Sequence, residues 1–275
     1  MKKQGFLYGS AILIMSVIIT KLIGALFKIP LTNILGGTGM GYFSSAYGIF
    51  MPVYAISVTG IPAAIAKMTA ENCALERYSN VKKIHRISLL SFTFIGLILS
   101  GIIIVLSVPF CRYVIETPGA FPSVVIIAPS IFFGCVMSVY RGYYEGLRNM
   151  YPTAVSQVIE AMIKLIAGLG LCWYTFKLAS DYPEKFFHII KNLGANIVIE
   201  NGITDISQLI IPYASAAAVL GVTLSSFGGM FFLIIRHKIY GDGITEDQIN
   251  RDKVTDSKKK ILSSLIKIVI PVAIG

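Results

Sequence analysis

Charge is scarce in this sequence, and acidic residues are the scarcer kind. Only 14% of the 275 residues are charged, and 14 acidic residues stand against 24 lysines and arginines. Soluble domains have about one-quarter charged residues, so this composition excludes an ordinary soluble enzyme or binding domain. Because 55% of the residues are hydrophobic and the mean hydropathy is +0.74, we predict an integral membrane protein.

Cysteine and histidine are rare as well, with four and three copies, and their spacings match no metal-ligand motif. A disulfide between Cys111 and Cys172 is one alternative on the oxidising side, but free packing cysteines are favoured. Paired acidic residues of the D-D-x-x-D type, which a membrane prenyl- or glycosyltransferase would need to bind a metal, are lacking, and Glu246-Asp247 alone is a weak signal. We predict no metal, no cofactor and no enzymatic activity.

Long apolar runs are what the sequence has instead. Six of them have the roughly 20 residues that cross a bilayer core: Leu7–Phe27, Tyr42–Ala66, Ile87–Phe110, Phe121–Tyr140, Pro152–Phe176 and Leu209–Ile235. Lipid permits only helices or closed barrels, and runs without strict alternation are helical. The predicted fold class is therefore all-α, a polytopic transmembrane helical bundle.

A seventh apolar run begins at Ile261 and has only some 15 residues before Gly275, too few to span a bilayer. We expect the chain to be the front part of a longer protein. The predicted organisation is a six-helix lobe over residues 1–235, a cytoplasmic linker over 236–260 and the start of a seventh helix over 261–275.

Basic residues fall mostly on one side of the predicted spans. With the N-terminus inside, the inner segments hold sixteen lysines and arginines, and the outer segments hold Lys28, Arg112, Lys177, Lys185 and Lys191. Cytoplasmic loops retain such residues, so this orientation is the predicted one. The +10 net charge is then explained by topology and by anionic membrane lipids, and we predict no nucleic-acid partner.

Connections and helix faces give three further expectations. The glycine-rich stretch Gly36–Gly41 lacks the context of a phosphate loop and is expected to be a turn between the first two helices. Residues 183–194 are expected to form an amphipathic helix on the outer membrane surface, with a lid over a cavity as the alternative. The last complete span has a small-residue packing face at Ala214, Ala218, Gly221, Ser225 and Gly228.

Prolines and glycines interrupt the second span at Pro52, Gly60 and Pro62. Proline removes a backbone donor and kinks a helix, and interrupted helices mark the substrate path in transporters. We interpret the three residues as a candidate hinge, with tolerated prolines in a packed helix as an equal alternative.

Charges inside spans are costly, at about 2.5–3.5 kcal/mol each at mid-bilayer. Lys21 and Lys28 lie seven residues apart on one face of the first helix. Lys28 can extend to the outer interface, whereas Lys21 lies deeper, and a cation that faces a watery cavity would suit an anionic headgroup such as a diphosphate. In the fifth span, Glu160 and Lys164 are spaced i, i+4, and a structural ion pair is the favoured interpretation.

Two stretches resemble a known family. RGYYEGLRNMYPTAVSQVIEAMIK, Arg141–Lys164, resembles the cytoplasmic turn of the stage V sporulation protein B group, and Thr20–Glu71 is similar to the first two helices of the same family. That group includes lipid II flippases and belongs to the multidrug/oligosaccharidyl-lipid/polysaccharide exporter superfamily. The resemblance implies about fourteen helices in two lobes, with this chain as the N-terminal lobe.

The same resemblance implies a flippase of the bacterial cytoplasmic membrane that moves an undecaprenyl-diphosphate-linked oligosaccharide or peptidoglycan precursor by alternating access, for cell-wall or spore-cortex synthesis. A cation-coupled multidrug or metabolite antiporter is the alternative. The expected substrate-binding residues are Lys21 and Lys28. The matched turn is expected to be structural or gating, through Arg141, Glu145, Arg148, Pro152, Gln157, Glu160 and Lys164.

Overall fold

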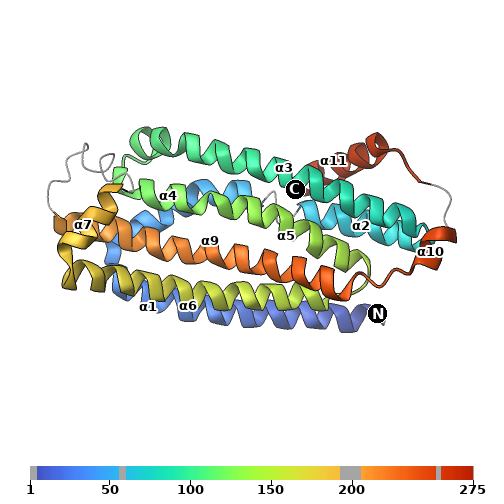
Figure 1. The fold of residues 1–275 in the computed structure, drawn as a ribbon, viewed down its shortest axis with the longest axis horizontal. Coiled ribbons are helices and arrows are strands. Elements are labelled where there is room, and N and C mark those ends of the chain that lie inside the picture. Colours follow the sequence, from blue (N-terminus) through green and yellow to red (C-terminus); the bar gives the residue numbers. More distant parts are fainter. Residues whose placement is uncertain (1–4, 56–59, 193–205, 252–254, 275) are drawn as a thin grey trace.

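The computed structural model describes residues 5–55, 60–192, 206–251 and 255–274. All regular elements in these ranges are helices, which run mostly along one long axis, so the predicted all-α class is confirmed (Figure 1). The helices are α1 (Phe6–Ala55), α2 (Ile61–Ala74), α3 (Tyr78–Pro109), α4 (Phe121–Ile127), α5 (Pro129–Gly146), α6 (Tyr151–Asp181), α7 (Pro183–Asn192), α9 (Ile206–Tyr240), α10 (Glu246–Arg251) and α11 (Lys258–Ile274), with two short turns, η2 (Phe110–Val114) and η3 (Pro118–Ala120).

Helix α1 is folded back on itself at Gly36. Gly36 has φ 64° and ψ −170°, a backbone conformation that glycine adopts and side chains resist. The rings of Phe27 and Phe43 lie 6.2 Å apart between centroids, whereas sixteen residues of continuous helix would separate them by roughly 24 Å. Residues 6–35 and 37–55 are therefore two antiparallel arms, and the turn expected at Gly36–Gly41 is confirmed.

Within the described ranges, five helical segments are long and apolar enough to cross a membrane: Leu7–Ala55, Tyr78–Val114, Pro118–Gly146, Tyr151–Asp181 and Leu209–Tyr240. Because the first of these contains both arms of α1, the described residues of the six predicted spans fall on observed helical segments. The second predicted span covers the end of α1 at Ala55 and the start of α2 at Ile61. Residues 56–59 lie outside the described ranges, so the hinge expected at Pro52, Gly60 and Pro62 stays a prediction.

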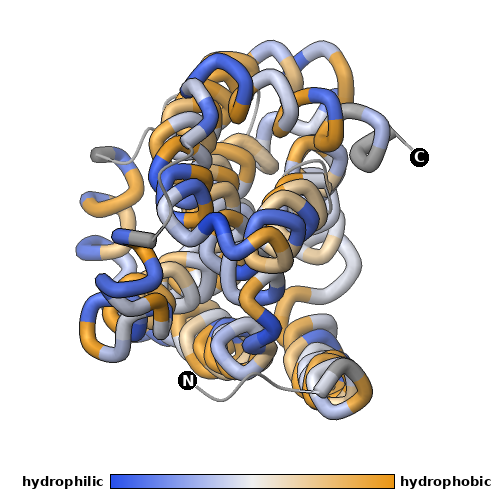
Figure 2. Tube along the Cα trace, turned by 90° about the vertical axis from the view of Figure 1, so that its right-hand side faces the viewer, coloured by the Kyte–Doolittle hydropathy of each residue, from blue (hydrophilic) through white to orange (hydrophobic). Residues whose placement is uncertain are grey.

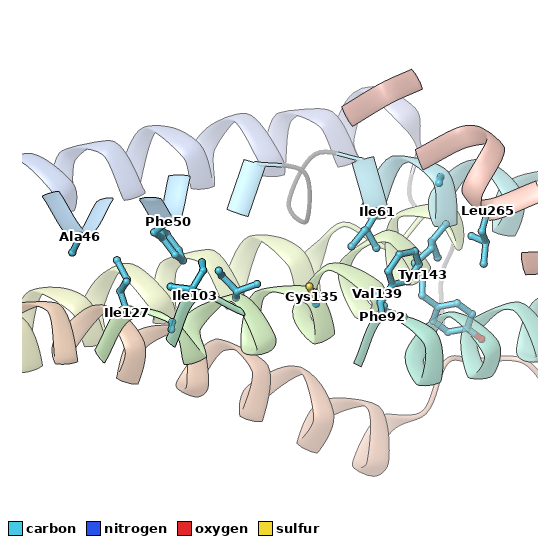
Figure 3. Packing of buried hydrophobic residues seen from close by; sticks show 14 of the residues in the cluster. Ala46, Phe50, Ile61, Phe92, Ile103, Ile127, Cys135, Val139, Tyr143 and Leu265 are labelled. Carbon is cyan, nitrogen blue, oxygen red and sulfur yellow. The ribbon is translucent and has the colours of Figure 1, made fainter. Parts of the chain in front are cut away.

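The main apolar core joins the second arm of α1 to α2, α3, α4, α5 and α11. Phe50, Ile61, Ile127, Cys135 and Leu265 are buried in one contiguous cluster that connects these helices (Figure 3). Large apolar side chains on the outer faces, such as Leu90 and Val105 of α3, remain 77% and 75% exposed. A bundle with an apolar exterior of this kind is what a lipid environment requires.

Helices α6 and α9 pack along their whole length, and small residues let their backbones approach. A Cβ atom added to Gly221 would collide with the backbone of Gly168, and one added to Gly228 would collide with Ile163. Ala214, Ala218 and Ser225 on the same face are buried. The small-residue packing face predicted on this helix is confirmed.

The two ends of the bundle differ in polarity. The start of α1, the α2–α3 and α5–α6 turns and α10 lie together at one end, and α7 lies at the other (Figure 1). Figure 2, viewed from the first end, shows hydrophilic stretches of these connections turned toward the viewer. We call this end the basic end, because lysines and arginines of the predicted inner segments lie on these connections or on the helix ends beside them, among them Arg77, Lys82, Lys83 and Arg148.

Helix α7 differs from its expected position. The sequence predicts an amphipathic helix on the membrane surface, but Phe186 and Ile190 on its apolar face are buried against Ala179, Leu209 and Tyr213. Helix α7 therefore packs its apolar face on the end of α6 and the beginning of α9. Leu193 and Gly194, which were expected in the same helix, lie outside the described residues.

The segment after α9 is tied to the bundle. Helix α9 continues to Tyr240, past the predicted boundary at residue 235, and the Tyr143 hydroxyl donates a hydrogen bond of 2.7 Å to Asp242. Asp256 accepts a bond of 2.9 Å from the Asn80 amide of α3. The linker predicted over residues 236–260 is thus anchored to the lobe by Tyr143 and Asn80.

Candidate functional site

A cavity of about 420 Å³ lies among both arms of α1, α6 and α9. We call it the central groove. Its lining combines aromatic and apolar side chains with a few polar ones: Val17, Thr20, Ile23, Gly24, Phe27, Tyr47, Phe50, Met51, Tyr54, Gln157, Glu160, Ala161, Lys164, Val222, Ser225 and Ser226. Because α1 folds back at Gly36, one helix supplies two walls of the groove. A mostly apolar concave site with a few convergent polar groups is typical of small-molecule and lipid binding.

One wall of the groove is an aromatic row on the second arm of α1. Phe43, Tyr47, Phe50 and Tyr54 recur at helical spacing, and successive ring centroids lie 4.8, 5.8 and 4.6 Å apart. Tyr47, Phe50 and Tyr54 present ring faces and edges to the groove, and Phe43 continues the row into a neighbouring cavity. The periodicity is visible in the sequence, but the sequence alone does not show which neighbour the row faces.

Lys164 is the cation of the central groove. Its ammonium lies 5.1 Å from the ring centroid of Phe27 and 5.6 Å from that of Tyr47, and it donates a hydrogen bond of 3.2 Å to the Tyr47 hydroxyl. Lys164 also lines an adjoining cavity of about 320 Å³, which we call the lateral cavity. Lys164 therefore stands where the two cavities meet.

Glu160 is the acid of the groove, and its partner comes from another helix. Nη2 of Arg141 on α5 lies 2.8 Å from Oε2 of Glu160 on α6, and Nε of Arg141 donates a bond of 3.0 Å to the Ser156 hydroxyl. The Arg141 side chain is 10% exposed and the Glu160 side chain 21%. The pair joins the two helices on either side of the conspicuous turn.

The ion pair expected between Glu160 and Lys164 is not formed. The described residues contain three ion pairs, Lys67–Glu71, Arg141–Glu160 and Lys260–Asp256. Arg141 offers a directional charge-assisted bond to the carboxylate, which leaves Lys164 to the aromatic rings of α1. The consequence is that Lys164 has no acidic side chain within ion-pair distance among the described residues.

Gln157 links the groove to the first arm of α1. Its Oε1 accepts a hydrogen bond of 2.8 Å from the Ser16 hydroxyl, and Ser16 is buried. A glutamine on α6 is thus held by a serine on the first arm of α1. The sequence places both residues on helices but gives no sign that they meet.

Lys21 and Lys28, on the first arm of α1, have different surroundings. Lys28 lines the lateral cavity together with Lys164, Phe27 and Tyr47. Lys21 is exposed, and it lines neither the central groove nor the lateral cavity, although Thr20, Ile23 and Gly24 beside it do. The structure therefore brings Lys28 and Lys164 together and leaves Lys21 outside; the substrate-binding role of Lys21 stays a prediction.

The remaining residues of the turn lie at the basic end. Glu145 is half-buried, Pro152 is buried in the first turn of α6, and Arg148 is exposed with φ 58°. The backbone N–H of Arg148 donates to the Glu145 carbonyl at 2.9 Å, which closes the end of α5. The candidate hinge residues lie near the adjoining ends of two helices, with Pro52 inside α1 and Gly60 and Pro62 at the start of α2.

The described histidines and cysteines do not form a metal-binding site. His85 and His237 lie on helices α3 and α9, and their ring centroids are 4.9 Å apart among tyrosines of α5. The described residues contain no group of three or more histidines, cysteines or acids that could hold a metal ion. Cys111 and Cys172 are buried and form no disulfide, as favoured from the sequence.

The fold and the groove define a class: a multi-pass membrane protein in which long helices enclose an aromatic and partly charged cavity. The chain belongs to the polysaccharide biosynthesis protein family, whose family model matches residues 6–181. The matched region contains both arms of α1, the Arg141–Glu160 pair and Lys164.

Curated relatives agree with the family. The chain is 28% identical over 176 residues to stage V sporulation protein B of Bacillus subtilis (strain 168), which covers 64% of this chain and 34% of that protein. It is 25% identical over 238 residues to the lipid II flippase MurJ of the same organism, covering 83% of this chain and 38% of that protein. The chain thus spans about a third of the length of these relatives.

A solved structure shares the fold. A MOP superfamily transporter from Pyrococcus furiosus Vc1 (DSM3638), described by a reversed polarity of its binding pocket, matches with a TM-score of 0.60 at 14% identity. The match covers 97% of this chain and 52% of the transporter chain. The chain therefore has the fold of about half of a MOP superfamily transporter, as the resemblance in the sequence implies.

Proposed function

We propose that the chain is the N-terminal lobe of a flippase that exports a lipid-linked, undecaprenyl-diphosphate-type oligosaccharide or peptidoglycan precursor. The observation on which this depends is the position of Lys164, a cation without an acidic partner among the described residues, in a groove with an aromatic wall. A lipid-linked sugar presents an anion, a polar sugar and an isoprenoid chain. The groove offers a cation, hydrogen-bonding side chains and apolar surface to match each part.

The substrate anion is assigned to Lys164 and Lys28. Both line the lateral cavity, so an anion there could contact two ammonium groups, each a strong charge-assisted donor. The sugar is assigned to the polar side of the groove, which Thr20, Gln157 and Ser225 line. Aromatic faces of Tyr47 and Tyr54 suit the apolar faces of sugar rings and the isoprenoid chain alike.

Alternating access is the mechanism that we infer for this lobe. Pro52 lies in the last turn of the second arm of α1 and Pro62 in the first turn of α2, and prolines at such positions permit one part of a membrane helix to move against another. In this proposal, Pro52, Gly60 and Pro62 form the hinge. The Arg141–Glu160 pair fixes α5 to α6 and keeps the opposite wall rigid.

The location proposed is the bacterial cytoplasmic membrane, with the N-terminus and the basic end in the cytoplasm. The basic end combines the start of α1 with the turns that contain most lysines and arginines, and such residues are retained on the cytoplasmic side. The export would then supply cell-wall or spore-cortex synthesis, as it does in the family that the sequence resembles.

Conditional depletion of the protein tests the proposed function. Cells without the protein are expected to accumulate lipid-linked precursor on the inner leaflet, where externally added enzymes that cleave such precursors cannot degrade it. Re-expression of the wild-type protein should restore the accessible pool. An accessible pool that stays unchanged through depletion, in a strain without a second exporter of the same family, would refute the proposal.

Glu160 favours one second candidate, a cation-coupled antiporter for drugs or metabolites. The residue lines the groove, and coupling sites in such transporters need a carboxylate inside the membrane. The pairing with Arg141 weakens this candidate, since the guanidinium already neutralises the carboxylate. Loss of ion-gradient-driven efflux in Glu160→Gln, with precursor export unchanged, would favour the antiporter over the flippase.

A further inference from the structure

A further cavity lies near the basic end, and it shares no lining residue with the central groove or the lateral cavity. It has a volume of about 560 Å³ and is formed by residues 83–91 of α3 and residues 258–262 of α11, which are far apart in the sequence. We call it the basic cavity. Its lining contains four basic and three large apolar residues: Lys83, Arg86, Ile87, Leu90, Ser91, Lys258, Lys259 and Leu262.

The cations of this cavity are not neutralised by acids. The ion pairs among the described residues are Lys67–Glu71, Arg141–Glu160 and Lys260–Asp256, and none involves a residue that lines the basic cavity. Lys83 donates a hydrogen bond of 2.5 Å to the main-chain carbonyl of Asp256, which holds α3 against the segment before α11. Four positive charges thus converge from two helices on one space.

The lysines of α11 are placed against the usual preference of a helix. Lys258, Lys259 and Lys260 occupy its first turn, where the helix dipole and the unpaired N–H groups favour negative charge. The Asp256 carboxylate lies 2.7 Å from the Lys260 ammonium and compensates one of the three. An anion in the basic cavity would compensate the other two together with Arg86.

The apolar residues lie on one side of this charged space. Along α3, Lys83, Ile87 and Leu90 lie on one face, so that charge gives way to apolar surface over two turns. Leu90 is 77% exposed and Leu262 38% exposed, and both line the cavity. A phosphate next to apolar chains, in this order from the end of the bundle toward its middle, is the arrangement of a phospholipid.

We propose that the basic cavity is a binding site for the phosphate diester of an anionic phospholipid, whose acyl chains lie along Leu90 and Leu262. Basic pockets between transmembrane helices near a membrane face suit anionic headgroups. A bound lipid would join α3 of the lobe to α11, since each helix supplies cations to the same phosphate. The site is separate from the central groove and does not depend on what the groove transports.

Lipid titration with matched variants tests this site. The purified protein is titrated with phosphatidylglycerol, phosphatidylcholine or inorganic phosphate, and bound molecules are counted by native mass spectrometry. The site variant combines Arg86→Gln, Lys258→Gln and Lys259→Gln. The control variant combines Lys67→Gln, Lys82→Gln and Lys238→Gln, which removes the same charge from exposed residues outside the cavity.

The wild-type and control proteins are expected to bind phosphatidylglycerol, and the site variant to bind it roughly tenfold or more weakly. Leu90→Gln should weaken phosphatidylglycerol binding without changing the response to inorganic phosphate. Equal losses in the site and control variants would overturn the proposal, as would equal binding of phosphatidylcholine. Phosphate binding that is as tight as phosphatidylglycerol binding would overturn the lipid assignment. Both triple variants must match the wild-type elution profile on size exclusion, and Leu90→Gln provides the test if the site variant does not.

Discussion

The guanidinium of Arg141 on α5 and the carboxylate of Glu160 on α6 form an ion pair of 2.8 Å, nineteen residues apart in the chain. Ser156 supports the same guanidinium through its hydroxyl, and the Ser156 hydroxyl in turn donates to the Thr153 carbonyl at 2.8 Å. The pair fixes the position of Glu160 at the groove and releases Lys164 from the local partner that the i, i+4 spacing suggests.

Breaking the pair from one side should destabilise the protein. Arg141→Gln or Glu160→Gln leaves a largely buried charge without its partner, at a cost of about 3 kcal/mol in the free energy of unfolding. The double variant should lose less than the sum of the two single losses, because no uncompensated charge remains. Unfolding in a detergent mixture, followed by circular dichroism, measures the four proteins. Strict additivity would mean that the pair is not coupled.

Lys164→Gln should lower precursor export by roughly tenfold or more, because hydrogen bonds to charged groups contribute about 1.5–3 kcal/mol. Lys177→Gln is the matched control on the same helix. Lys177 lies over the Trp173 ring at 5.1 Å and does not line either cavity of the site. Export by proteoliposomes with a labelled lipid-linked sugar provides the measurement. Equal export by both variants would contradict the anion assignment.

Lys28→Ala and Lys21→Ala compare the two lysines predicted from the sequence. Lys28 lines the lateral cavity with Lys164, so its loss should impair export, whereas Lys21 lines neither cavity and its loss should impair export less. The same proteoliposome assay ranks the two variants, with membrane insertion checked by the yield of folded protein. Abolished export in Lys21→Ala would instead support the substrate-binding role that the sequence predicts for Lys21.

Gly36→Ala should destabilise the protein by about 1–3 kcal/mol, because a side chain at φ 64° strains the backbone. Gly37→Ala is its control. Both glycines have open space around an added Cβ atom, but only Gly36 has a positive φ. Gly37→Ala should therefore be neutral or stabilise by up to about 1 kcal/mol. Thermal unfolding measures the stability of both variants. Equal losses of stability would contradict the explanation by the positive φ of Gly36.

The contact of Asp256 with α3 should weaken in acid. Hydrogen bonds from Lys260 and then from Asn80 lower the pKa of Asp256 below its usual 3.8. A carboxyl group with a lowered pKa stabilises the fold above its unfolded pKa and loses this contribution as the pH falls through the folded pKa. Hydrogen exchange of the first turn of α11 should therefore accelerate below about pH 4, and Asp256→Asn should remove this dependence. A pH response that persists in the variant would assign it to another group.

Local patterns predicted much of the fold. Apolar runs of membrane length located the helices, Gly36 marked the reversal, and the small residues from Ala214 to Gly228 marked the face that packs on α6. Each signal depends on residues close together in the chain, where helical periodicity and backbone conformation decide the outcome. The packing of Phe186 and Ile190 onto α9 depends on partners far along the chain. The sequence therefore predicts that α7 is an amphipathic helix but does not predict where it packs.

The candidate site was predictable only in part. The turn between α5 and α6 and the charges on α6 are conspicuous in a sequence with so few charges. Which charges meet is a property of two helices, however, and the spacing of Glu160 and Lys164 suggested a local pair that Arg141 displaces. Lys164 became the groove cation because α1 brings Phe27 and Tyr47 to the same ammonium, a contact that no local pattern encodes.

Helix α11 packs against α2 and α3, and Leu265 of α11, Ile61 of α2 and Phe50 of the aromatic row belong to one apolar cluster. A displacement of α11 would therefore be transmitted to the aromatic wall of the groove through this shared packing. The opposite wall is held by the close approach of Gly168 on α6 to Gly221 on α9, so the two walls would respond unequally to the same mechanical load.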